Sequence, residues 1–79
     1  MKVVIAKVDQ VYFDAEATSV TVPGSDGEMT VLGNHMPFVT TLKPGVVIVR
    51  ANTLPEGQQV FEITGGVLEV HAGGTTIIL

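Results

Sequence analysis

The chain lacks cysteine and tryptophan altogether and carries little charge. Without cysteine, neither a disulfide framework nor a thiolate metal site can form. Only four of the 79 residues are Lys or Arg, against eight Asp or Glu, so the formal net charge is −4. A protein that binds a nucleic-acid backbone needs a basic surface. We therefore expect no nucleic-acid partner.

Long apolar runs are also missing. No uninterrupted apolar stretch approaches the roughly 20 residues of a membrane-spanning helix. The apolar stretch 3–6 ends at Lys7 and is too short for the core of a signal peptide. These absences predict no signal peptide and no direct insertion into a membrane.

What the chain does contain favours β-structure. Hydrophobic residues make up 46% of the chain, which is too much for an intrinsically disordered segment. Valine, isoleucine and threonine together fill about a third of it, and β-branched residues favour a pleated sheet over a helix. Glycine and proline recur at intervals typical of an all-β sandwich or barrel.

The predicted fold is a single all-β domain over residues 1–79 with little or no helix. We expect a flattened β-sandwich or barrel of about 8–10 short, mostly antiparallel strands. The strands predicted from alternation and turn signals cover residues 2–8, 11–13, 16–22, 28–32, 38–42, 46–50, 60–64, 67–71 and 75–79.

Residues 46–50 are apolar on both faces of the predicted strand. Val46 and Ile48 lie on one face, and Val47 and Val49 on the other. Such a strand is either central in a sandwich or covered by something outside the domain. We predict that Val47 or Val49 is exposed and contacts a partner.

His35 and His71 are the residues that could suggest an enzyme or a metal protein. His35 follows Asp26 and Glu28 closely in sequence, but the spacing matches no metal-ligand or nucleophile motif. A histidine that hydrogen-bonds its own loop, and another that faces solvent, explain the two residues more simply. We expect no catalytic residue, no metal site and no cofactor.

Two ordered motifs carry a resemblance to a known family. Residues 22–45 read VPGSDGEMTVLGNHMPFVTTLKPG, and residues 65–70 read GGVLEV. Together with the closing apolar residues 76–79 and Phe13, they resemble the N-terminal β-sandwich of the ATP synthase epsilon subunit. Thr30, Gly33 and Met36 depart from the usual glycine, proline and alanine of the first motif.

The resemblance implies a mechanical role and no catalysis by this chain. It implies a central-stalk subunit of an F-type ATP synthase that bridges the gamma subunit and the c-subunit ring. Such a subunit couples proton or sodium flow to ATP synthesis at the cytoplasmic face of a membrane. An interaction module with a different partner is the alternative.

The resemblance also implies site residues. The Gly-x-x-Gly-Glu turn would meet the polar loops of the c-ring through Glu28, with Ser25 and Asp26 beside it. His35 and Pro37 would shape the adjacent loop, and Val47 and Val49 would contact gamma.

Most family members continue into a C-terminal helical hairpin, which residues 1–79 do not include. Two expectations follow. Either the protein is a short epsilon that couples the rotor without helical inhibition, or these residues are part of a longer one.

Overall fold

The computed structural model describes all residues, 1–79, and is built almost entirely of strands. The strands are β1 (Lys2–Lys7), β2 (Gln10–Glu16), β3 (Ser19–Gly24), β4 (Gly27–Leu32), β5 (Phe38–Leu42), β6 (Gly45–Arg50), β7 (Gln58–Ile63), β8 (Gly66–His71) and β9 (Gly74–Ile78). Helical structure is confined to a single 3-10 turn, η1 (Pro55–Gly57), in the polar loop before β7. The all-β prediction is therefore confirmed.

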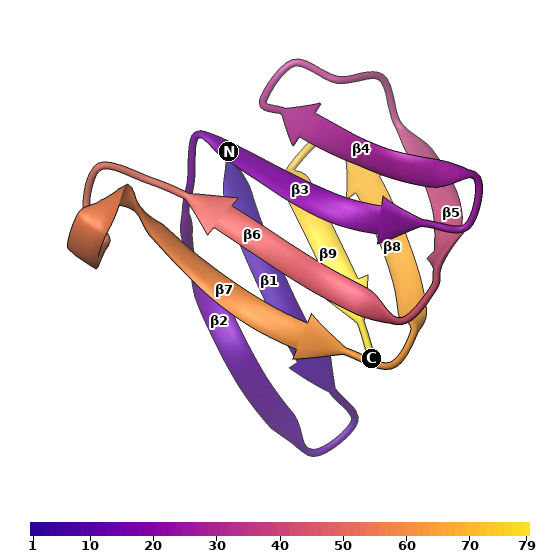
Figure 1. Cartoon of the computed structure of the whole chain (residues 1–79). Helices are drawn as coiled ribbons and strands as arrows, with labels where there is room; N and C mark the ends of the chain where they lie inside the picture. Colours follow the sequence, from indigo (N-terminus) through magenta and orange to yellow (C-terminus); the bar gives the residue numbers. More distant parts are fainter.

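The strands form one sheet that folds over on itself into two layers (Figure 1). The front layer consists of β4, β3, β6 and β7, and the back layer of β2, β1, β9, β8 and β5. They join where Gly24 of β3 pairs with Leu42 of β5. Every pairing is antiparallel except that of β1 with β9, which is parallel. The result is the predicted flattened sandwich, open on the side opposite the join.

The core lies between the layers and follows the alternation of the strands. In β1, for example, Val3 and Ile5 point inward and are fully buried, whereas Lys2 is exposed. Aliphatic side chains dominate the core, as the composition suggested. Its members are Val3, Ile5, Phe13, Ala17, Val20, Val22, Val31, Leu42, Val47, Val49, Ala51, Ile63, Leu68, Val70 and Ile77.

The prediction that Val47 or Val49 is exposed is wrong. Both side chains have 0% exposure, because the pairings of β6 with β3 and β7 turn them into the core. The exposed side of the strand carries Val46, at 41%, together with half-buried Ile48. Since both faces of β6 are apolar, the sequence did not indicate which one faces inward.

Candidate functional site

The acidic turn between β3 and β4 projects from one end of the sandwich. Gly27 has a φ of 134°, a conformation that L-residues rarely adopt, so a glycine suits this turn. Asp26 and Glu28 are exposed and take part in no ion pair; the ion pairs of the structure are Met1 amino–Glu16 and Lys2–Asp14. The turn therefore presents two carboxylates that are free to meet a basic group.

Ser25 ties this turn to β5. Its hydroxyl donates to the carbonyl oxygen of Thr41 at 3.1 Å and shares a hydrogen bond with the Thr41 hydroxyl at 2.7 Å. The Ser25 backbone N–H donates to the same carbonyl at 3.0 Å. Ser25 thus holds the turn in place, and its hydroxyl is already engaged within the domain.

A groove of about 420 Å³ runs between the turn and β5. Asp26 and Glu28 line the groove, and Met29 and Phe38 contribute apolar side chains to it. Long basic side chains prefer such mixed surroundings, with the aliphatic stem on apolar surface and the charged end near carboxylates. The groove is suited to a lysine or arginine of a partner.

His35 hydrogen-bonds within its own loop, as the simpler interpretation predicted. Its Nδ1 lies 2.9 Å from the Met36 carbonyl oxygen, and its ring packs on Phe38 with the ring centres 4.8 Å apart. None of its hydrogen bonds reaches Asp26 or Glu28. Pro37 is exposed in the same loop, directly before β5. His35 and Pro37 thus lie where they can shape this loop.

His71 is exposed at the turn between β8 and β9. Its Nδ1 accepts a hydrogen bond from the Gly73 N–H at 3.2 Å, and its Nε2 lies 3.1 Å from the Thr76 hydroxyl. No group of three or more His, Asp or Glu side chains is placed to hold a metal ion. The structure also has no helix with the length and apolar character needed to cross a membrane.

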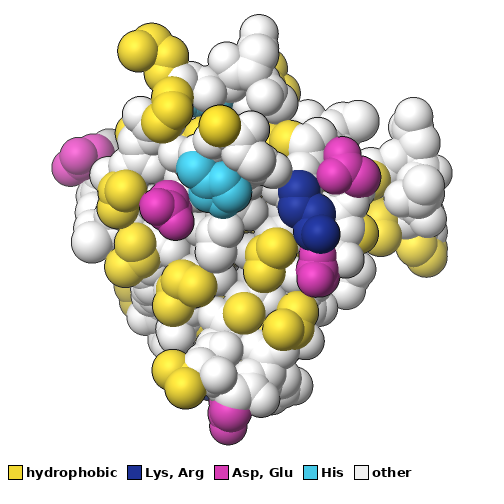
Figure 2. Space-filling view, turned by 180° about the vertical axis from the view of Figure 1, so that it is seen from behind, with side chains coloured by type: hydrophobic (Ala, Val, Ile, Leu, Met, Phe, Trp, Pro, Cys, Tyr) yellow, Lys and Arg dark blue, Asp and Glu magenta, His cyan; other side chains and the backbone are white.

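The outer face of the back layer carries an apolar surface that the sequence analysis missed. The register aligns Val67 of β8, Ile78 of β9, Ala6 of β1 and Val11 of β2 in one row across four strands. Figure 2 shows hydrophobic side chains gathered on this side of the molecule. Val4 and Val39 lie on the same face. We call the six residues the back-face patch: Val4, Ala6, Val11, Val39, Val67 and Ile78. Each residue is unremarkable in sequence, and only the strand order reveals the row.

The outer face of the front layer is more polar. Arg50 donates to the Thr21 hydroxyl at 2.9 Å, which in turn hydrogen-bonds the Thr30 hydroxyl at 2.9 Å. Val46 and Val60 are exposed beside this network. Both outer faces therefore carry apolar side chains, but the larger continuous set is on the back face.

Comparison with known proteins gives a match along the whole chain. The family model described as "ATP synthase, Delta/Epsilon chain, beta-sandwich domain" matches residues 1–79. An ATP synthase epsilon chain of Herminiimonas arsenicoxydans is 35% identical over 78 residues, which are 99% of this chain and 55% of that protein. One of Cereibacter sphaeroides is 40% identical over 62 residues, or 78% of this chain and 45% of that protein. The chain thus spans about half the length of these curated relatives.

Solved structures agree on the fold. A chain in the cryo-EM structure of the Euglena gracilis mitochondrial ATP synthase (OSCP/F1/c-ring in rotational state 1) superimposes with a TM-score of 0.83. The two are 26% identical, and the match covers 96% of this chain and 48% of that one. A chain in the central stalk and c-ring structure of the Tetrahymena thermophila mitochondrial ATP synthase gives a TM-score of 0.81. It is 20% identical, with 99% of this chain and 61% of that one covered, and it supports the fold alone.

Proposed function

Because this chain belongs to the β-sandwich family of ATP synthase delta and epsilon chains, we propose that it is a central-stalk subunit of an F-type ATP synthase. In this role it bridges the gamma subunit and the c-ring and helps couple ion flow to ATP synthesis. It catalyses no reaction itself, and it lies at the cytoplasmic face of a membrane as a peripheral part of the complex. The observation that carries the proposal is the family match over the entire chain.

The acidic turn is the proposed contact with the c-ring. Asp26 and Glu28 are exposed at the end of the sandwich, and the groove beside them suits a basic side chain. Ser25 supports the contact by holding the turn against β5. An exposed ion pair contributes only up to about 1 kcal/mol, so this contact orients the domain more than it holds it.

The back-face patch is the proposed contact with gamma. A stable interface needs an extended apolar centre, and the six side chains of this patch lie on adjoining strands. Val47 and Val49 cannot serve, because no part of either side chain reaches the surface. The proposal therefore assigns gamma to the sheet formed by β5, β8, β9, β1 and β2.

Titration calorimetry against a purified gamma subunit tests this assignment with a matched pair of variants. Val67 and Val46 are exposed by 39% and 41%; Val67 lies on β8 in the back layer and Val46 on β6 in the front layer. We expect Val67→Asp to weaken binding by about tenfold or more, because a carboxylate would be buried without a partner. Val46→Asp should bind like the unchanged chain. Equal loss in both variants, or loss in Val46→Asp alone, would contradict the assignment.

The c-ring contact needs a separate measurement, with the chain bound to gamma and the ring present. Glu28→Lys should weaken association with the ring and leave gamma binding unchanged. Glu56→Lys, the same exchange at an exposed position of η1, is its control. Binding to neither gamma nor the ring would contradict the stalk proposal and favour the alternative, an interaction module with another partner.

A further inference from the structure

Strands β2 and β7 begin and end the main path of paired strands and come together without pairing. Each has a single neighbour, β1 for β2 and β6 for β7, so each has one free edge. The rings of Phe13 and Phe61 meet edge to face between them, with centres 6.1 Å apart. This contact closes the core at the open side of the sandwich but makes no backbone hydrogen bond.

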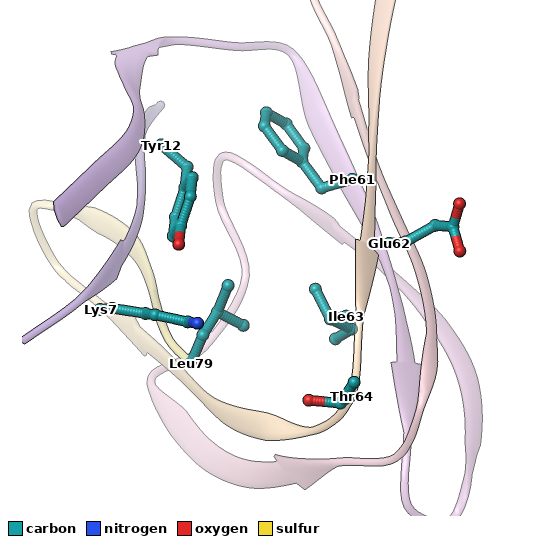
Figure 3. A pocket seen from close by; sticks show the side chains of 7 residues that line it. All are labelled: Lys7, Tyr12, Phe61, Glu62, Ile63, Thr64 and Leu79. Carbon is teal, nitrogen blue, oxygen red and sulfur yellow. The ribbon is translucent and has the colours of Figure 1, made fainter.

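A pocket of about 240 Å³ remains beside this contact. Four of its seven lining residues are hydrophobic, and the full lining is Lys7, Tyr12, Phe61, Glu62, Ile63, Thr64 and Leu79. Figure 3 shows Tyr12, Phe61, Ile63 and Leu79 directed into the space, with Glu62 pointing away from it. We call this space the β2–β7 slot.

The β2 side of the slot contains an irregularity. The register of β1 with β2 passes from Ile5–Phe13 to Ala6–Val11, so Tyr12 is the extra residue of a β-bulge. A bulge interrupts edge pairing and redirects a side chain. Here it discourages strand addition on β2 and directs Tyr12 into the slot.

The β7 side has no such protection. Its six residues pair in unbroken register with β6 and include no proline, no lysine and no bulge. Its one charged residue, Glu62, lies opposite Val46 and takes part in no ion pair. An unprotected edge of this kind is a template for a further strand, and a strand beside Glu62 gains most from a basic residue there.

We propose that the β2–β7 slot binds an extended segment of a partner protein, which adds to β7 as an antiparallel strand. One face of the segment inserts apolar side chains among Tyr12, Phe61, Ile63 and Leu79. The other face places a lysine or arginine opposite Glu62. This site is separate from the acidic turn and lies off the back-face patch, so it does not depend on the proposed function.

The probe is the peptide acetyl-Thr-Val-Lys-Leu-Thr-Val-amide, whose apolar and polar residues alternate as this site requires. Its binding to the full chain is followed by NMR, with amide hydrogen exchange read at each residue of β7. We expect exchange to slow at alternate residues of β7, those whose N–H groups point away from β6. The amides of β8, away from the slot, should be unaffected.

Two matched controls separate the contribution of backbone hydrogen bonds to peptide binding from the contribution of the charge on Glu62. A peptide methylated on the alternate backbone nitrogens that would face β7 should not bind. Glu62→Lys should weaken binding about threefold or more and recover it with a peptide that carries Glu in place of Lys. Glu69→Lys, the same exchange on the back layer, should leave binding unchanged.

The outcomes that would overturn the proposal are distinct from those for gamma and the ring. No binding at millimolar peptide would overturn it. Binding that tolerates backbone methylation would also overturn it, since the contact would then be apolar only. Shifts confined to the back-face patch would assign the peptide to that surface instead.

Discussion

Val46 and Val47 are adjacent and identical, yet their surroundings are opposite. Val46 is 41% exposed, and Val47 is completely buried. We therefore expect Val47→Asp to unfold the domain, because an unpaired buried carboxylate costs several kcal/mol and small domains have little stability to lose. Val46→Asp should stay folded, with a stability change of about 1 kcal/mol or less. Thermal unfolding followed by circular dichroism compares the two variants. A folded Val47→Asp protein would contradict the burial of the Val47 side chain.

Lys2 and Asp14 form an exposed ion pair with Nζ and Oδ1 2.9 Å apart. The hydrogen bond to Asp14, followed by its charge, raises the pKa of Lys2 above the ordinary value of 10.5. A cation with a raised pKa stabilises the fold below the pKa of the unfolded chain. That stabilisation is lost as the pH rises through the higher pKa of the folded chain.

The pH dependence of this pair gives a second prediction. The unchanged chain and Asp14→Asn should differ in urea midpoint at pH 7 and pH 9 by the same small amount. The difference should shrink above about pH 10.5, the ordinary pKa of a lysine, because Lys2 then loses its proton more readily in the unfolded chain than in the folded one. Urea titrations at several pH values measure it, and a difference that grows above pH 10.5 would show that the sign is wrong.

At the scale of elements, the parallel pairing of β1 with β9 depends on one glycine. Gly74 lies opposite Lys2 with a φ of 140°, and an added Cβ would collide with the Lys2 carbonyl oxygen. We expect Gly74→Ala to lower the free energy of unfolding by about 2 kcal/mol or more, because strain and collision add.

Gly57 provides the comparison for Gly74. It also has a positive φ, of 79°, but a Cβ there would meet nothing within 4 Å. Gly57→Ala should therefore lose only about 1 kcal/mol in urea denaturation, from backbone strain alone. Equal losses at Gly57 and Gly74 would mean that the contact with Lys2 is unimportant.

The strands could be predicted from the sequence better than their partners. Alternation and turn residues indicated nine strands, and nine are present. The strand predicted at 11–13 extends over Gln10–Glu16, because pairing with β1 recruits flanking residues of no β preference. Conversely, Ser19 and Thr21 of β3 are buried although polar, since β3 lies between strands on both sides. The length of β2 and the burial of Ser19 and Thr21 both depend on the neighbouring strands with which β2 and β3 pair.

For the whole molecule, local motifs predicted one candidate surface and missed two others. The acidic turn is contiguous in sequence, so Ser25, Asp26 and Glu28 could be named directly, and the turn is exposed as expected. The back-face patch joins five strands in an order that the sequence does not state. The β2–β7 slot needs both the closure of the sheet and the bulge at Tyr12. A surface whose residues come from several strands can be recognised only once the order of those strands is known.

The position of β1 between β2 and β9 also determines how this chain can reach its fold. Strand β2 follows β1 directly and can pair with it as soon as both are synthesised. The other edge of β1 must wait until β9 has been synthesised, because Lys2 pairs with Gly74. Contacts so distant along the chain delay folding, to the order of milliseconds to seconds in β-rich domains. During that interval the second edge of β1 has no partner, and its free backbone N–H and C=O groups are open to pairing with another chain.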